Sequence, residues 1–159
     1  FAPIMLDVAR VDVVDNARRP AGSVDASIAV PPAEGARRWA QARLQAAGRD
    51  GFVRLTIREA AIVESQLPKT GGVKGMLTNE QTTRYDARIA VEITAEKPSA
   101  DGLRASTQAN ASRFITLPEN TSLAGREAAL QNLSNRLLED LNARLDAGVR
   151  RDLGRLVTR

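Results

Sequence analysis

The sequence predicts an α+β domain with the element order β-α-β-β-β-α, in which a four-stranded mixed sheet carries two helices packed on one face. Leucines recur at mostly four-residue steps between residues 122 and 145, which is typical of one face of a long amphipathic helix. Residues 82–96 alternate between apolar and polar, which is the pattern of a half-buried strand. A shorter helical segment, 33–47, separates two strand-like segments, so these two strands should be parallel.

Length and composition favour a single domain over residues 1–159. A chain of about 150 residues buries roughly 70% of the surface that its unfolded form exposes, which is enough for a real core. Apolar residues make up 43% of the chain and charged residues 26%, as in globular proteins. Aromatic residues make up only 3%, so the core must consist of Ala, Val, Leu and Ile, and base-stacking platforms for nucleic acid are not expected.

The first strand is expected over residues 3–14. Its apolar phase shifts once, so a bulge near Ala9 would keep one long, bent strand continuous. Residues 16–30 contain small residues, arginines and a proline, which favours an irregular surface loop.

Two prolines, Pro31 and Pro32, then open the first helix, 33–47, because a first helical turn tolerates the missing N–H. Gly48 is expected to end this helix as its C′ residue. Trp39 is interpreted as core packing rather than as a ligand contact.

Three further strands are expected over residues 52–64, 82–96 and 103–117, and the last two form a hairpin through the connection 97–102. Residues 66–81 make a long excursion between strands. This excursion carries three apolar residues that either insert into a partner or membrane surface or fold back onto the body: Val73, Met76 and Leu77.

The closing helix is expected to begin at a cap formed by Thr121 or Ser122 and to run to about Leu145. Leu123 is assigned to its apolar stripe. At about 1.5 Å per residue, such a helix crosses the whole sheet. Residues 146–159 carry several arginines and are expected to break or fray.

The sheet face opposite the helices should be polar, and its arginines are the candidate partner- or anion-binding residues. Two interpretations stay open at this point: a solvated face whose charges form cross-strand ion pairs, or a docking surface. The candidates are Arg54, Arg58, Arg84, Arg88 and Arg104.

The residue types present exclude several chemistries. The chain has neither Cys nor His, so thiol nucleophiles, disulfides and imidazole catalysis are ruled out. Residues 70–75 superficially resemble a phosphate loop but lack its spacing, and Asp7, Asp12 and Asp15 do not form a calcium-loop series. All three lysines are expected in loops, which disfavours a buried Lys base. No catalytic site, metal or cofactor is therefore expected.

The net charge is +4 with a pI near 10.3, but the excess is spread along the chain, which is typical of a mixed solvated surface. The sequence begins with Phe1, which we interpret as the start of a processed or trimmed product that a targeting segment could have preceded. No run of about 18 apolar residues is present.

The order of elements resembles a group of small lipoproteins. A strand of the type VRLTIREAAIV is followed by a long loop, by TRYDARIAV over residues 83–91, by LRASTQANASRFI and by a long amphipathic helix. This order is similar to that of small outer-membrane lipoproteins of Gram-negative bacteria. Two groups look similar, the LptE-type subunit of the lipopolysaccharide translocon and the PqiC-type auxiliary lipoproteins of ABC transport systems.

The resemblance implies a periplasmic domain anchored to the outer membrane through an acylated N-terminus that lies before this sequence. It also implies a non-enzymatic accessory or assembly role in envelope lipid or lipopolysaccharide transport, with an envelope protein complex or an anionic lipid as partner. A basic nucleic-acid-binding domain that uses the same arginines, and a small hydrolase, remain the alternatives, although no specific nucleic acid is expected.

Overall fold

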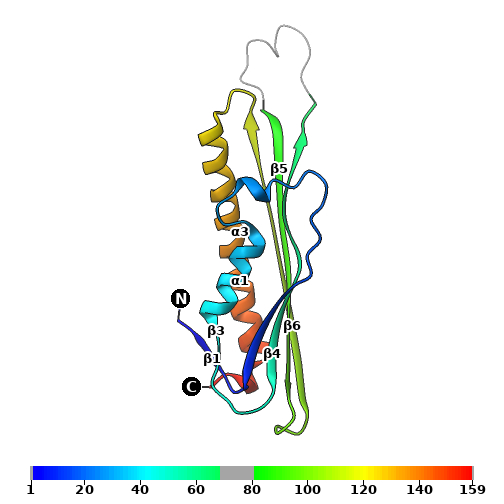
Figure 1. Cartoon of the computed structure of the whole chain (residues 1–159), viewed down its shortest axis with the longest axis vertical. Helices are drawn as coiled ribbons and strands as arrows, with labels where there is room; N and C mark the ends of the chain where they lie inside the picture. Colours follow the sequence, from blue (N-terminus) through cyan, green and yellow to red (C-terminus); the bar gives the residue numbers. More distant parts are fainter. Residues whose placement is uncertain (1, 69–80, 159) are drawn as a thin grey trace.

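The computed structural model describes residues 2–68 and 81–158, and its long strands run alongside one long helix (Figure 1). Four strands form the main sheet in the order β2-β4-β5-β6, and two short strands, β1 and β3, form a second sheet. The two described α-helices lie on the same face of the main sheet (Figure 1). The elements are β1 (Ile4–Leu6), β2 (Arg10–Asp15), α1 (Pro32–Arg43), β3 (Leu44–Ala46), β4 (Phe52–Gln66), β5 (Gln81–Lys97), β6 (Leu103–Pro118) and α3 (Leu123–Asp152).

This architecture confirms the predicted α+β class with a four-stranded mixed sheet. β2 pairs with β4 in parallel, as expected of two strands on either side of a helix, whereas β4, β5 and β6 pair antiparallel. The core lies between the sheet and the helices. Alternate residues of β5, from Tyr85 to Ile93, meet the leucines of α3 from Leu130 to Leu145 there.

The prediction of one strand over residues 3–14 was wrong, as was the helix end at residue 47. β1 leaves the main sheet and pairs in parallel with β3, which occupies the end of the predicted helix. The helix stops at Arg43 because Leu44 takes an extended conformation that buries its side chain. Gly48 is not the C′ residue. It packs so closely on Asp7 and Val8 that a Cβ would lie 2.6 Å from their backbone atoms.

The irregular segment between β2 and α1 continues the sheet edge beyond the end of β2. Val24 N donates to Ile62 O at 2.9 Å, and Glu64 N donates to Gly22 O at 3.0 Å. The Asp25 carboxylate accepts from Ile62 N at 3.0 Å and so replaces a strand carbonyl. A bulge between Ile57 and Glu59 shifts the pairing of β4 with β5 by one residue, so the alternation of buried and exposed side chains along β4 changes phase there. The sequence alone did not indicate this bulge.

The closing helix begins as predicted, since the Ser122 hydroxyl accepts from Gly125 N at 3.0 Å. Two expectations for this helix were wrong. It continues through Gly148 to Asp152 instead of fraying, because Gly148 lets the helix lie directly against Thr107. Leu123 is 70% exposed and lies outside the buried stripe.

The residues after α3 dock back onto the N-terminal strand. Leu153 and Leu156 are buried, and Val157 forms a bridge with Leu6. Thr158 N also donates to Met5 O at 2.9 Å. Among the described residues, no helix combines the length and apolarity needed to cross a membrane.

Candidate docking surface

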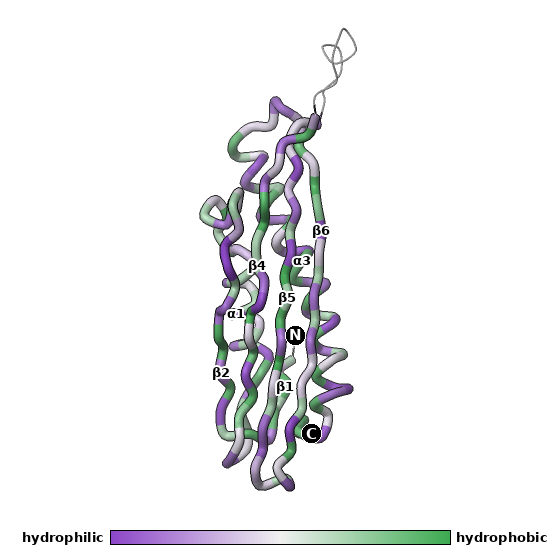
Figure 2. Tube along the Cα trace, turned by 90° about the vertical axis from the view of Figure 1, so that its right-hand side faces the viewer, coloured by the Kyte–Doolittle hydropathy of each residue, from purple (hydrophilic) through white to green (hydrophobic). Residues whose placement is uncertain are grey.

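The sheet face turned away from the helices faces the viewer in Figure 2 and is called the open face here. Side chains alternate along each strand, so the residues between the buried positions of β4, β5 and β6 point outward. Hydrophilic and hydrophobic positions accordingly alternate along β5 in Figure 2. All five predicted arginines lie in these strands at exposed or half-buried positions.

Four of the five arginines have a carboxylate within ion-pair distance. The guanidinium nitrogens lie 3.7 Å from Asp12 for Arg54, 2.9 Å from Asp86 for Arg84 and 3.5 Å from Glu96 for Arg104. The Arg58 Nε donates to Glu92 at 3.0 Å. These pairs match the interpretation of a solvated face with cross-strand and neighbouring ion pairs, so most of the positive charge is already balanced.

Arg88 differs from the other four. Within residues 2–68 and 81–158 it has no carboxylate at ion-pair distance. It lines a groove of about 340 Å³ on the open face, and Pro20 of the segment between β2 and α1 forms part of that groove's lining. The other lining residues are Glu59, Ala61, Val63, Ser65 and Asp86.

The neighbouring Arg84 keeps Asp86 from neutralising Arg88. Its guanidinium donates two hydrogen bonds from Nε, at 3.1 and 3.0 Å, and one from Nη2 at 2.9 Å. These bonds are the main reason that the pKa of Asp86 is lowered, and the positive charges of Arg84 and Arg88 lower it further. The same bonds raise the pKa of Arg84. Asp86 therefore stays ionised and is held by Arg84, while the Arg88 guanidinium remains available to an anion.

Two aromatic rings on the open face were not assigned to the site from the sequence. Phe114 is 58% exposed, and the Arg84 guanidinium carbon lies 3.9 Å from its ring centroid. Phe52 has Arg10 and Arg54 over its ring, each at 5.2 Å. The signal was available for Phe114, because it falls on the polar phase of the alternation in residues 103–117.

The three apolar loop candidates, Val73, Met76 and Leu77, lie outside the described residues.

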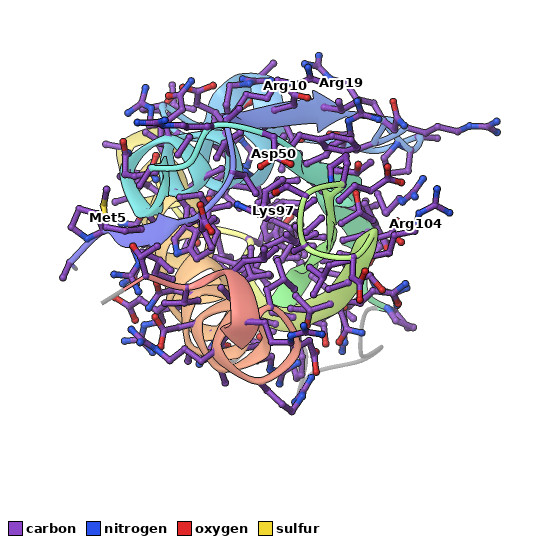
Figure 3. All side chains as sticks on the ribbon, turned by 90° about the horizontal axis from the view of Figure 1, so that it is seen from below. Met5, Arg10, Arg19, Asp50, Lys97 and Arg104 are labelled. Carbon is purple, nitrogen blue, oxygen red and sulfur yellow. The ribbon has the colours of Figure 1, made fainter. Side chains whose placement is uncertain are left out.

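The expectation that Lys97 lies in a loop was wrong. Lys97 is the last residue of β5 and is buried at the end of the molecule shown in Figure 3. Its ammonium group lies 2.8 Å from the Asp7 carboxylate and 3.4 Å from Asp50. It also donates to the Asp7 carbonyl at 2.8 Å. The hydrogen bond from Lys97 to the Asp7 carboxylate is the main reason that the pKa of Lys97 is raised. A lysine held protonated in this way links the end of β5 to the segments that contain Asp7 and Asp50, and its charge is the wrong protonation state for a general base.

The sequence cluster of aspartates is dispersed in space, and each carboxylate has a basic partner. Asp7 pairs with Lys97, Asp12 with Arg10, and Asp15 with Arg37. In the part of the chain that the structure describes, no group of three acidic side chains gathers at metal-binding distance.

Comparison with known proteins gives a weak structural similarity and no sequence match. No protein-family model matches the chain, and no curated protein matches it significantly. Rare lipoprotein B from Shewanella oneidensis is 13% identical with a TM-score of 0.41, over 87% of this chain and 92% of that one. A minor lipoprotein from Acinetobacter baumannii is 12% identical with a TM-score of 0.40, over 90% and 94%.

A DUF330 protein from Xanthomonas campestris is 12% identical with a TM-score of 0.35, over 94% of this chain and 86% of that one. The first two of these proteins are described as lipoproteins. Neither the LptE type nor the PqiC type is distinguished by them. At these values the similarity assigns no family, so the function is argued below from the chain's own residues.

Proposed function

We propose that this domain is a non-enzymatic binding module of the bacterial cell envelope, which docks an envelope protein complex or an anionic lipid on its open face. In this proposal it serves as an accessory or assembly factor in envelope lipid or lipopolysaccharide transport. An acylated segment would hold it at the periplasmic side of the outer membrane. The observation that carries the proposal is the uncovered open face, with the unpaired Arg88 in its groove.

Arg88 supplies the chemistry that an anionic group needs. A guanidinium is planar and donates two parallel hydrogen bonds to a phosphate or carboxylate, which gives both affinity and orientation. Ala61 and Val63 line the same groove and offer apolar contact beside the charge. A ligand that joins an anionic group to an apolar body fits this combination better than a bare ion does.

The charge pattern favours a ligand with a single anionic group over a polyanion. Glu59 and Asp86 line the groove together with Arg88, and four further arginines are balanced by carboxylates. Nucleic acid needs a continuous row of cations that track its phosphates, and affinity then falls steeply with salt. Of the five candidate arginines on the described part of the open face, Arg88 is available and the other four are in ion pairs, which supports the envelope role over the nucleic-acid alternative.

Vesicle binding tests the proposal. We expect the protein to co-sediment with vesicles that contain phosphatidylglycerol or lipopolysaccharide, and to bind pure phosphatidylcholine vesicles more weakly. Replacing Arg88→Glu should reduce this binding about tenfold, since it removes the available cation and adds a repulsive charge. The matched control is Arg155→Glu, which makes the same charge change at an exposed position after α3.

A combined Arg54→Glu, Arg84→Glu and Arg88→Glu variant should keep the fold, checked by circular dichroism, and abolish capture. Equal losses for Arg88→Glu and Arg155→Glu would show that only net charge matters and would contradict a site at Arg88. Tight binding to arbitrary DNA that weakens steeply with salt would support the nucleic-acid alternative instead.

A further inference from the structure

The two edges of the main sheet differ in how they are paired and covered. At the β2 edge, the segment that contains Val24 and Asp25 continues the pairing along β4. At the other edge, β6 pairs only with β5 among the described strands. Part of this edge is covered from α3. Arg144 donates to the carbonyl of Asn110, and the Arg113 guanidinium binds Asp140 at 2.6 Å.

Beyond Arg113, towards the end of β6, no described strand other than β5 pairs with this edge. A groove of about 350 Å³ lies there between β6 and α3. Ile115, Leu117 and Leu133 give it an apolar lining, and both charged residues that line it are arginines. The full lining is Arg113, Phe114, Ile115, Thr116, Leu117, Ala129, Asn132, Leu133 and Arg136.

The backbone of this open stretch faces outward at alternate residues. The carbonyl of Asn110 points away from β5, since Arg144 reaches it from α3. In an antiparallel ladder the N–H and C=O of one residue point to the same side and alternate along the strand. The β5–β6 register is continuous from Leu103 to Leu117, so Phe114 and Thr116 present both groups to the open edge. Such an edge is a template for another strand unless it is covered.

We propose that the β6 edge from Ser112 to Leu117 binds an extended peptide segment of a partner protein, which adds to the sheet as a further strand. Its side chains on the α3 side would be apolar and would fill the groove, as in other cases of strand addition. One side chain on that side would be acidic. The proposal goes beyond the anion-binding function, because it uses the main-chain edge of β6 and the groove between β6 and α3 instead of the groove beside Arg88.

The acidic side chain of the partner segment is inferred from the positive charge of Arg136 in the groove. Arg136 donates to Asn132 Oδ1 at 3.1 Å, and it has no carboxylate partner within residues 2–68 and 81–158. Arg113 already has Asp140, and this pairing raises the pKa of Arg113. A partner carboxylate would therefore pair with Arg136 without displacing an existing ion pair.

A labelled peptide provides the probe. We expect a fluorescein-tagged peptide of the sequence Val-Thr-Val-Thr-Glu-Thr-Val to bind saturably, measured by fluorescence anisotropy. Thr116→Pro should weaken binding at least about tenfold, because it removes an edge N–H that β5 does not use. Ser106→Pro is the matched control. It makes the same change on the same edge, in phase with Thr116 and outside the groove.

A charge exchange keeps the test informative if Thr116→Pro does not fold. Arg136→Glu should bind the Glu peptide about tenfold more weakly and should prefer the same peptide with Lys in place of Glu. Absence of saturable binding by the unmodified protein would overturn the proposal, as would equal losses for Thr116→Pro and Ser106→Pro. Concentration-dependent dimerisation that only Thr116→Pro abolishes would identify a second copy as the occupant and would also overturn it.

Discussion

Arginine–carboxylate pairs occur both between the two helices and on the open face of the main sheet, in different surroundings. On the helix side, the Arg43 side chain is only 7% exposed and binds Asp146 and the carbonyl of Ala2. On the open face, the side chains of Arg58 and Arg104 are 56% and 80% exposed. A pair removed from water cannot lose one partner without leaving an uncompensated charge, whereas an exposed pair exchanges readily with solvent or with a ligand. The helix side should therefore determine stability, and the open face should determine binding.

The largest expected effect comes from the core on the helix side. Leu137 is fully buried in α3, and replacing it by alanine should lower the free energy of unfolding by about 3 kcal/mol, because a cavity remains. The measurement is urea unfolding followed by circular dichroism. Leu123→Ala is the control on the same helix, and since Leu123 is 70% exposed it should change stability by less than about 0.5 kcal/mol. Similar losses for both variants would contradict the assignment of the faces.

The next effect concerns the buried arginine. Arg43→Met should cost about 2 kcal/mol, less than the full loss for a buried pair, because Asp146 keeps Arg150 at 2.8 Å as a second partner. Removing the exposed partner instead, with Arg150→Ala, should cost no more than about 1 kcal/mol. Both values come from the same urea titration. An equal cost for the two variants would show that burial does not distinguish these pairs.

Acid should destabilise the protein through its depressed carboxyl groups. The hydrogen bond from Arg151 is the largest cause that lowers the pKa of Asp152, to about 2, and bonds from Arg113 and Arg150 lower the pKa of Asp140 and Asp146. The folded state therefore binds fewer protons than the unfolded state. The contribution of each group is fully present above the unfolded pKa, 3.8 for Asp, and is lost as the pH falls through the folded pKa, which for Asp152 is about 2.

Urea midpoints measured between pH 5 and pH 2 should accordingly fall below about pH 4. Asp152→Asn should remove part of this slope and leave the rest. A midpoint that stays constant over this range would contradict the pairing of these carboxylates.

The smallest expected effect lies on the open face. Arg58→Ala and Glu92→Ala should each change the free energy of unfolding by less than about 1 kcal/mol, because the Arg58 side chain is 56% exposed and solvent replaces the lost partner. A double-mutant cycle over the two positions gives their coupling energy directly. A coupling well above 1 kcal/mol would place the open-face pairs among the structural elements and would weaken their proposed role in binding.

The candidate site was only partly predictable from the sequence. The alternation in β5 and β6 placed Arg84, Arg88 and Arg104 correctly on one face, because side-chain direction follows from strand periodicity alone. It did not show which of the five candidate arginines lacks a carboxylate among the described residues, since ion pairing depends on which strands are neighbours and in what register. The groove beside Arg88 also needs Pro20, which lies far away in the sequence.

Long periodic patterns in the sequence were enough to predict the leucine-striped α3, the alternating β5 with its hairpin to β6, and the four-stranded mixed sheet. The positions of the short segments depend on contacts between residues that are distant in the sequence. Leu44–Ala46 forms a strand because β1 pairs with it, and α3 continues past Gly148 because this glycine lets the helix pack directly against Thr107. Periodicity shows which face of an element is apolar and must be buried, whereas the element that packs on this face is determined by contacts distant in the sequence.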